Sequence, residues 1–238
     1  MQNKKIWFEL EAGYYDKIIK SGLIKNRGIQ ANWHNLTYKN VLDEIDEGSI
    51  LLDYASGSGT FIGRYYKEKD SIGVDISKNQ IDYSKNEFPE HIFLNNKDFF
   101  IEDYLNYFDV ITVLGLIEFL NTEEVENLLV KLKKSLKPGG KLIITTPNYS
   151  LLMRLYLFLL SRLKPNNYEP FTVNKLNSKV AKLVSKSWGY QSYEIKKIVS
   201  LGVFFSFISI DLGIKIDQFI QKIFKYGSGY ILFITLKK

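Results

Sequence analysis

The chain has 238 residues and a formal net charge of +6, with 45% hydrophobic and 24% charged residues. This balance is typical of a globular protein and argues against intrinsic disorder, and the length allows one domain with a sizeable core. No cysteine is present, which excludes disulfides and thiolate metal sites. The two histidines, His34 and His91, are too few and too far apart for a histidine metal site. The first residues lack the apolar core of a signal peptide, so we expect a cytoplasmic protein.

Charge is distributed unevenly along the chain. Residues 1–130 carry 13 Lys/Arg against 22 Asp/Glu, a net charge of −9, whereas residues 131–238 carry 19 against 4, a net charge of +15. A basic half of this kind indicates a surface that faces a polyanion, either nucleic acid or anionic lipid headgroups. A lysine-rich solvated face explains the same charge equally well.

Two helices are predicted ahead of the first strand. Residues 4–21 form the first, which carries Tyr14 and Tyr15, and residues 32–46 form the second. There is no repeat and no low-complexity linker, so residues 1–47 are expected to cap a single domain rather than to fold separately.

Residues 50–61 combine a buried strand, a tight turn and a helix start. Three apolar residues predict the strand, and Gly57 and Gly59 predict the turn. Thr60 is expected to be the N-cap of a helix over residues 60–69. A turn of this kind brings backbone N–H groups close to a nucleotide-like ligand.

The acid that ends this strand, Asp53, would weaken a phosphate site and favour a ligand with positive charge. The pattern Asp53-x-Ala55-x-Gly57-x-Gly59 after an apolar strand resembles motif I of the class I S-adenosylmethionine (SAM)-dependent methyltransferases. That family usually has glycine where this chain has Ala55. The extra methyl group lies where the backbone approaches the methionine part of SAM.

The next predicted strand, residues 71–77, contains a second acid. Asp75 follows Gly57 by 18 residues, which is about the spacing at which a carboxylate meets the two ribose hydroxyls of a nucleotide. The alternative is that Asp75 caps the helix that starts near Ser77.

A third short strand, residues 91–95, precedes a third acid. The resemblance implies that Asp98 accepts from the adenine amino group of SAM and that Phe99 packs against the adenine face. Ile76 and Leu114 are expected to contact the adenosine. Asp98 as a plain turn residue is the alternative.

The rest of the core follows the family pattern. A strand over 108–114 leads to Glu118-Phe119, where the family often has Glu-His, and a helix over 122–136 follows. The stretch Leu-Lys-Pro-Gly-Gly at 136–140 precedes a strand over 141–146, and this is the most specific resemblance after motif I. No Asp/Asn-Pro-Pro-Tyr/Phe string follows the fourth strand, which argues against nucleic-acid bases as acceptors.

The region beyond residue 147 contains two apolar runs, at 151–163 and 199–210. The first has 13 residues, too short to cross a bilayer, which needs about 20. Such runs are typical of a helix in a membrane interface, and equally of a hydrophobic lid or a dimer contact. The other elements predicted here are helices over 172–186 and 214–224 and strands over 192–199 and 227–236.

The resemblance implies an α/β fold with a doubly wound, mostly parallel seven-stranded sheet whose last strand is antiparallel. Residues 1–47 form a helical cap, 48–146 the SAM-binding core, and 147–238 the apolar helices on the substrate side and the final strands, all in one domain. It implies methyl transfer from SAM, by in-line displacement, to a small-molecule or lipid-linked acceptor. A peripheral position at the inner, anionic membrane surface is one option.

The implied site has a donor side and an acceptor side. Three carboxylates, Asp53, Asp75 and Asp98, are expected to line one cleft. Asp53, Ala55 and the backbone of Gly57 and Gly59 are expected near the methionine part of SAM, and Ser56 is a further cofactor-binding residue. His34 and Glu118 are the candidate general bases. Arg27 or His34 is a candidate partner for the SAM carboxylate, and Tyr14 and Tyr15 are candidates to close over the donor.

Three other functions share some of these features. An NAD-linked oxidoreductase explains the glycine turn and Asp75, but not Asp53 or the stretch at 136–140. An RNA methyltransferase fits the basic half, although no RNA-binding module is recognised. A non-catalytic membrane-associated protein with a decayed SAM site is left open by Ala55 and Phe119.

Overall fold

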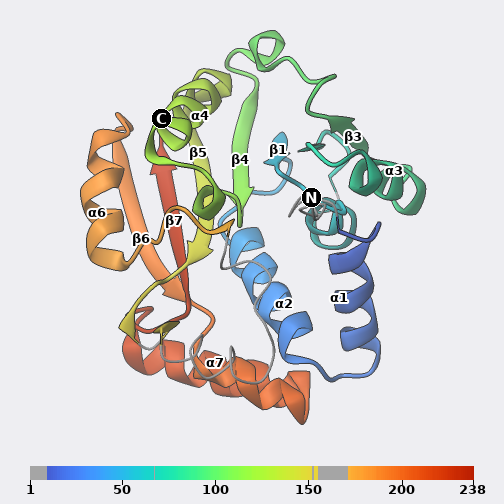
Figure 1. The fold of residues 1–238 in the computed structure, drawn as a ribbon, viewed down its shortest axis with the longest axis vertical. Coiled ribbons are helices and arrows are strands. Elements are labelled where there is room, and N and C mark those ends of the chain that lie inside the picture. Colours follow the sequence, from blue (N-terminus) through green and yellow to red (C-terminus); the bar gives the residue numbers. More distant parts are fainter. Residues whose placement is uncertain (1–9, 67, 152, 155–170) are drawn as a thin grey trace, which may run out of the picture.

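The computed structural model describes residues 10–66, 68–151, 153–154 and 171–238. Seven strands form one sheet (Figure 1), namely β1 (Leu51–Tyr54), β2 (Ile72–Asp75), β3 (Ile92–Asn95), β4 (Phe108–Leu114), β5 (Leu136–Pro147), β6 (Ser192–Ile198) and β7 (Ile231–Lys237). Their order is β3-β2-β1-β4-β5-β7-β6, and β7 is antiparallel to both neighbours while the other paired strands are parallel. The predicted fold class is confirmed.

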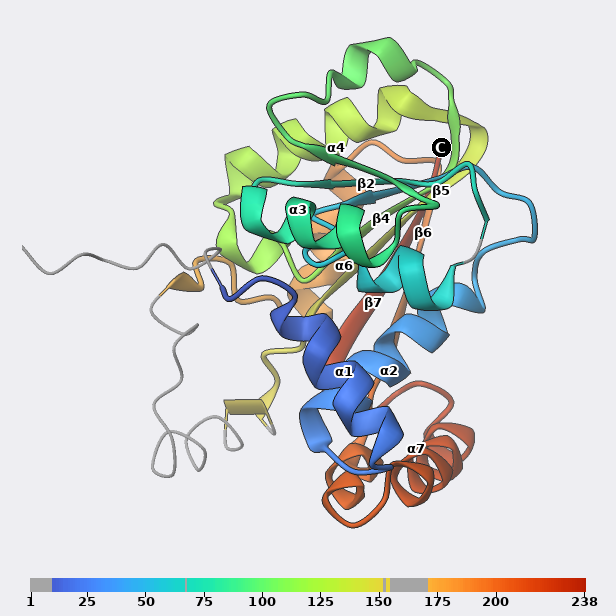
Figure 2. The same ribbon diagram turned by 90° about the vertical axis from the view of Figure 1, so that its right-hand side faces the viewer.

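Helices cover both faces of this sheet (Figures 1 and 2). They are α1 (Tyr14–Ile24), α2 (Ile29–Leu42), α3 (Lys78–Glu87), α4 (Thr122–Ser135), α6 (Ser178–Ser187) and α7 (Ile210–Phe224), with the short helices η1 (Phe61–Tyr65), η2 (Ile101–Tyr104), η3 (Ile117–Phe119) and η5 (Leu201–Phe207). Side chains of α4 and α6 join the core on one face, and side chains of α2, η1, α3 and η5 join the core on the other.

Strand β1 shows why both faces are buried. Successive side chains of a strand point to opposite faces of the sheet. Leu52 accordingly packs in the core with α4 and α6, and Leu51 packs in the core with α2 and η1. An uninterrupted apolar run is therefore the expected pattern for a central parallel strand covered on both sides.

The helices of the first half differ from the prediction in their bounds, and the one predicted over 32–46 is α2, Ile29–Leu42. The helix predicted over 4–21 begins only after Gly13, whose φ of 73° is left-handed, and residues 1–9 lie outside the described residues. The helix predicted over 60–69 is the single π-turn η1, which ends at extended Tyr66. The Thr60 side chain makes no capping hydrogen bond there.

In the second half, capping side chains decide where two helices start. The helix predicted over 172–186 begins at Ser178, because the Asn177 side chain accepts from the backbone N–H groups of the first turn. The helix predicted over 214–224 begins at Ile210, because Ser209 caps it. Most of the predicted apolar helix over 151–163 lies outside the described residues.

The parallel strands end together at one edge of the sheet. Pro147 at the end of β5 and Ile198 at the end of β6 both pair with Ile231, the first residue of β7. Ligands of open α/β sheets bind outside this carboxyl edge. Helix α7 precedes Ile231, so it also lies at this edge, next to α1 and α2 (Figure 2).

Candidate functional site

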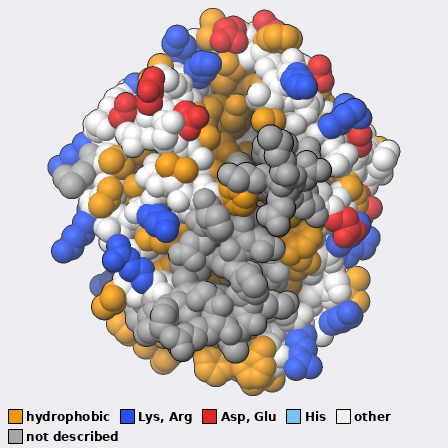
Figure 3. All heavy atoms as spheres, viewed as in Figure 1, with side chains coloured by type: hydrophobic (Ala, Val, Ile, Leu, Met, Phe, Trp, Pro, Cys, Tyr) orange, Lys and Arg blue, Asp and Glu red, His pale blue; other side chains and the backbone are white. Residues whose placement is uncertain are grey.

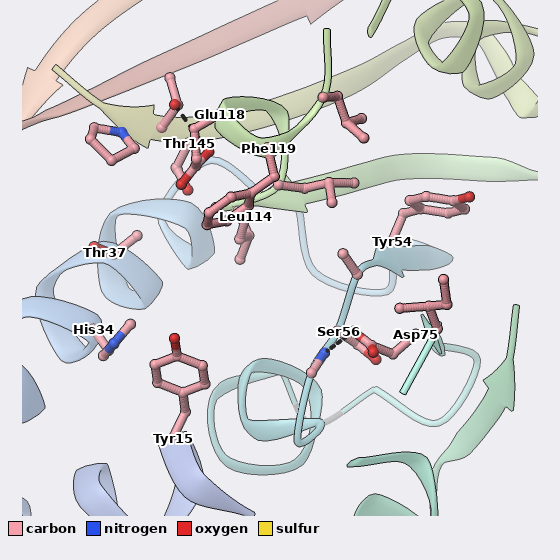
Figure 4. Close-up of a pocket in the computed structure, with 18 of the residues that line it drawn as sticks. Tyr15, His34, Thr37, Tyr54, Ser56, Asp75, Leu114, Glu118, Phe119 and Thr145 are labelled. Carbon is pink, nitrogen blue, oxygen red and sulfur yellow. Dashed lines mark hydrogen bonds between the residues drawn. The ribbon is translucent and has the colours of Figure 1, made fainter. Parts of the chain in front are cut away.

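A cavity of about 780 Å³ opens at the carboxyl edge of the sheet. It is within the usual size range of small-molecule sites. Its walls come from the turn after β1, the end of β2, the loop after β4, helices α1 and α2, and the first turns of α4 (Figure 4). The lining residues include Tyr15, Trp33, His34, Tyr38, Tyr54, Ala55, Ser56, Gly57, Ser58, Thr60, Asp75, Ile76, Asn96, Leu114, Glu118, Phe119 and Tyr149.

The two glycines of the turn after β1 have different surroundings. Both have left-handed backbones, with φ of 54° at Gly57 and 71° at Gly59. A Cβ added at Gly57 would meet no atom within 4 Å, so this position faces open space in the cavity. A Cβ at Gly59 would lie 2.6 Å from the Phe93 ring, and Gly59 does not line the cavity. Gly59 therefore allows close packing, whereas Gly57 leaves room for a ligand.

The same turn contains unsatisfied hydroxyls. The side-chain oxygens of Ser56, Ser58 and Thr60 are buried and have no hydrogen-bond partner, and the three residues line the cavity. A buried hydroxyl without a partner costs about 1–3 kcal/mol. Three in one turn indicate that a polar ligand supplies their partners. Ala55 in this turn has a φ of 68°, a conformation that costs a non-glycine residue about 1–2 kcal/mol.

Asp75 lines the cavity at the end of β2 (Figure 4). Its Oδ2 accepts from the backbone N–H of Gly57 at 2.8 Å, and its Oδ1 accepts from the N–H of Ser77 at 2.8 Å. Burial raises the pKa of this carboxyl, and the backbone hydrogen bonds oppose that shift. Asp75 therefore bonds to the start of α3, as one of the two alternatives predicts, and it also lines the cavity. Its contact with a ribose stays a prediction.

Asp53 lies behind the cavity wall rather than on it. It is 2% exposed, and Thr112, its register partner on β4, donates to its Oδ1 at 2.7 Å. Burial raises the pKa of the Asp53 carboxyl to about 7, against the effect of the Thr112 hydroxyl. The next residue along the strand, Tyr54, lines the cavity instead. Strand alternation is the signal that could have identified Tyr54.

The predicted adenine contacts are corrected by the structure. Asp98 is exposed and does not line the cavity, and Phe99 is buried in the core, where its ring stacks on Tyr104 at 5.1 Å. Asn96, the first residue after β3, lines the cavity, and the hydroxyl of Tyr54 donates to its Oδ1 at 3.1 Å. The predicted cleft with three carboxylates is therefore wrong, because only Asp75 of the three reaches it.

Glu118 lines the cavity from the loop after β4 (Figure 4). It is 6% exposed, and the hydroxyl of Thr146 donates to its Oε2 at 3.1 Å. Burial raises the pKa of the Glu118 carboxyl to about 7, so a substantial fraction is ionised near neutral pH. A buried carboxyl with this pKa is suited to exchanging a proton with a ligand.

His34 lines the cavity from α2, beside the rings of Tyr15 at 5.0 Å and Tyr38 at 6.0 Å. Burial lowers its pKa to about 4, so the imidazole is neutral near pH 7. The other predicted cation, Arg27, donates to the carbonyl of Phe207 and does not line the cavity. Of the two tyrosines on α1, Tyr15 lines the cavity and Tyr14 does not.

Comparisons with known proteins agree with this fold. A methyltransferase-domain family model matches residues 29–194, more than half of the chain. Similar solved structures include a SAM-dependent methyltransferase from Archaeoglobus fulgidus, with 19% identity, a TM-score of 0.59, and coverage of 94% of this chain and 98% of that one. A possible histamine N-methyltransferase from Thermotoga maritima has 15% identity, a TM-score of 0.62, and coverage of 94% and 96%.

A third similar structure contains the methyl donor. Phosphoethanolamine N-methyltransferase 2 of Haemonchus contortus, solved with SAM, has 16% identity, a TM-score of 0.52, and coverage of 86% of this chain and 52% of that one. No curated protein sequence matches the chain. The chain belongs to the methyltransferase-domain family and is a class I SAM-dependent enzyme.

The residues of the cavity fit SAM. Asp75 offers carboxylate oxygens to a ribose diol, Gly57 leaves open space beside the turn, and the unsatisfied hydroxyls can pair with a polar ligand. Among the described residues, no group of His, Asp and Glu side chains could hold a metal ion.

Proposed function

We propose that this enzyme transfers the methyl group of SAM to a small-molecule or lipid-linked acceptor that binds beside His34 and Glu118. The observation that carries the proposal is one cavity with two kinds of wall. Asp75 and Gly57 form a wall suited to a nucleoside, and Glu118 and His34 add a titratable carboxyl and a neutral imidazole.

On the donor side, Asp75 would bind the ribose hydroxyls, with Ile76 and Leu114 as apolar contacts to the adenosine. Asn96 replaces Asp98 as the polar group nearest the expected adenine position, because it lines the cavity and Asp98 does not. Ala55, Ser56 and Gly57 would lie along the methionine part. Asp53 and Gly59 support this wall from behind.

On the acceptor side, the chemistry asks little of the protein. SAM supplies a methyl group that its positively charged sulfur already activates. The chain has to align the acceptor, exclude water and, for a hydroxyl or ammonium acceptor, remove a proton. Glu118 is the better base, because a pKa of about 7 keeps much of it ionised near neutral pH. A neutral His34 can hold the acceptor by a hydrogen bond.

The donor half of the proposal is tested by isothermal titration with SAM. Wild type should bind, and Asp75→Ala should weaken binding about tenfold or more, because a hydrogen bond to a charged group contributes about 1.5–3 kcal/mol. Asp98→Ala is the matched control, since it removes an exposed carboxylate outside the cavity. No binding by wild type, or equal binding by wild type and Asp75→Ala, would contradict the assignment.

The acceptor half is tested by incubating labelled SAM with separated lipid and aqueous extracts of the source cell. Label should enter one of the fractions with wild type, and Glu118→Gln should lose this transfer while still binding SAM. Binding of SAM without transfer by wild type to either extract would favour a non-catalytic protein. Membership of the methyltransferase family gives the NAD-linked oxidoreductase alternative no support.

A further inference from the structure

Helix α7 presents apolar side chains to solvent, and its buried side contains two polar residues besides the apolar Ile210 and Ile214. Asp217 is 3% exposed and Gln221 is 7% exposed, whereas Phe219 is 64% exposed and Ile223 is 56% exposed. The Asp217 carboxylate fits the interior because it accepts from the N–H and the hydroxyl of Ser200 at 2.5 and 2.6 Å. A helix that packs on a core normally keeps polar residues, and not large apolar ones, on its solvent side.

Three of the exposed apolar residues of α7 lie on one side of the helix. Leu212, Phe219 and Ile223 are spaced at i, i+7 and i+11, and the half-buried Ile216 lies between them on the same side. We call this stripe the α7 face. Orange side chains gather at the lower edge of the molecule in Figure 3, where Figure 1 shows α7. Nine of the twenty large exposed apolar side chains of the described residues lie in the short segment 201–226.

Neighbouring elements extend the α7 face. Phe207 and Ile208, just before α7, are 54% and 55% exposed, and Ile24, at the end of α1, is 77% exposed. The end of α1 lies next to the start of α7, because the N–H of Ile210 donates to the carbonyl of Asn26 at 2.9 Å. Clustered apolar exposure on this scale marks an interaction surface.

Charge around the α7 face is predominantly positive. Lys215 and Lys222 lie one above the other on α7, and Lys225 follows its last residue; all three are exposed. The exposed acid of this helix, Asp211, accepts from the side chain of Asn26 at 2.8 Å. Apolar side chains flanked by lysines are the pattern of a helix that lies in the interface of an anionic membrane.

The same charges disfavour a second copy of the chain as the occupant. A two-fold dimer would place the same patch on both partners. Lys215, Lys222 and Lys225 of one copy would then approach those of the other, with Asp211 as the single exposed acid of α7 to offset them. An anionic lipid surface satisfies both the apolar and the basic part of the face.

The α7 face is close to the cavity. Helix α2, which carries His34, packs against η5, where the Asn32 side chain donates to the Ser206 hydroxyl at 2.8 Å. Both α7 and the cavity lie at the carboxyl edge of the sheet. No helix in the described part of the chain is long and apolar enough to cross a bilayer.

We infer that the α7 face rests on an anionic lipid bilayer, with Phe219 and Ile223 at the boundary between headgroups and acyl chains and Lys215 and Lys222 at the phosphates. Surface binding of this kind needs no spanning helix. The α7 face would bring the cavity to a membrane that holds a lipid-linked acceptor, and in this respect the inference rests on the proposed function.

Cosedimentation with vesicles tests the inference. Phosphatidylcholine vesicles are compared with vesicles of phosphatidylcholine and phosphatidylglycerol in equal parts, at low and high salt. Wild type should bind only the anionic vesicles and should be released by salt. Phe219→Ser with Ile223→Ser should lower the partition coefficient about tenfold or more for each residue. Lys215→Glu with Lys222→Glu should lower it about fivefold or more for each.

Matched controls remove the same chemistry elsewhere. Phe100, on the loop after β3, is 61% exposed, so Phe100→Ser removes an exposed aromatic away from α7. Lys182→Glu with Lys186→Glu on α6 changes the net charge by the same amount as the α7 pair. Both controls should bind like wild type.

The outcomes separate this inference from the proposed function. It is overturned if wild type fails to sediment at low salt, if the α6 pair loses as much binding as the α7 pair, or if light scattering shows a wild-type dimer that Phe219→Ser with Ile223→Ser dissociates. SAM titration on the same samples reports the function separately. SAM binding without vesicle binding contradicts only the membrane inference, and vesicle binding without SAM binding contradicts only the function.

Discussion

Replacing each glycine of the turn after β1 by alanine should separate ligand binding from folding. Both positions have left-handed backbones, so both variants pay the conformational cost of a side chain there, about 1–2 kcal/mol. Their surroundings differ. The new Cβ of Gly57→Ala enters open space in the cavity, whereas that of Gly59→Ala would lie 2.6 Å from the Phe93 ring and 2.8 Å from the Ser84 hydroxyl.

The expected magnitudes follow from these contacts. Gly57→Ala should lower the free energy of unfolding by about 1–2 kcal/mol, which is the backbone cost alone. Gly59→Ala should lower it by about 2–5 kcal/mol, since overpacking a core adds about 1–3 kcal/mol. The loss of affinity for SAM should instead be larger for Gly57→Ala than for Gly59→Ala. Gly57→Ala should bind about tenfold or more weakly, because its methyl group occupies ligand space.

Urea unfolding without ligand and titration with SAM measure the two quantities on the same samples. Any Gly59→Ala that remains folded should bind SAM better than Gly57→Ala does. Two results would refute the reasoning. One is Gly57→Ala binding SAM like wild type, and the other is Gly57→Ala losing more stability than Gly59→Ala.

Three further predictions concern single side chains. Burial raises the pKa of Glu118 from 4.5 to about 7, so the folded protein holds this proton more tightly than the unfolded chain does. The free energy of unfolding should therefore fall as the pH rises from 4.5 through about 7. Urea unfolding of Glu118→Gln should not show this loss across the same range. Arg64→Met should lower the free energy of unfolding by about 3 kcal/mol, because Asp16 is fully buried and loses two hydrogen bonds of 2.6 Å. Asp16→Leu with Arg64→Met should recover part of this lost stability. Equal stability of Arg64→Met and wild type would be contrary evidence. Asn96→Ala should weaken SAM binding about fivefold by calorimetry, the value of one net hydrogen bond, and no change would remove Asn96 from the site.

The sheet could be predicted from sequence because its signals are local. The apolar runs of β1 and β4, the turn glycines and the capped start of α4 each determine a short segment, and the family pattern orders them. The first residues of the helices were harder to predict, because Asn177 and Ser209 act as caps through side-chain hydrogen bonds that the spacing of apolar residues does not reveal.

The site was predicted less fully, for a physical reason. Which side chain reaches the cavity depends on the phase of strand alternation and on where each strand ends. Asp53 is out of phase with the cavity and Tyr54 is in phase. Asn96, directly after β3, lines the cavity, whereas Asp98, two residues further on, does not. Helices α1 and α2 also contribute aromatic residues to the cavity, of which Tyr15 was a candidate from the sequence and Trp33 and Tyr38 were not. Trp33 and Tyr38 lie far from the turn after β1 in sequence, so no local pattern indicates them.

The raised pKa values near the donor wall have a consequence that distinguishes SAM from other nucleotides. Burial raises the pKa of both Asp53 and Asp75, and the charge of Asp75 raises the pKa of Asp53 further. A ligand with net positive charge favours their ionised forms, so by linkage its affinity must rise as the pH rises through about 7, where Asp53 titrates. An anionic dinucleotide would show the opposite slope. Titrations of SAM on either side of this pH therefore show whether these carboxyls favour a cationic ligand. Asp53→Asn should flatten the pH dependence of the SAM affinity. An affinity for SAM that falls with rising pH would mean that these carboxyls do not sense the donor.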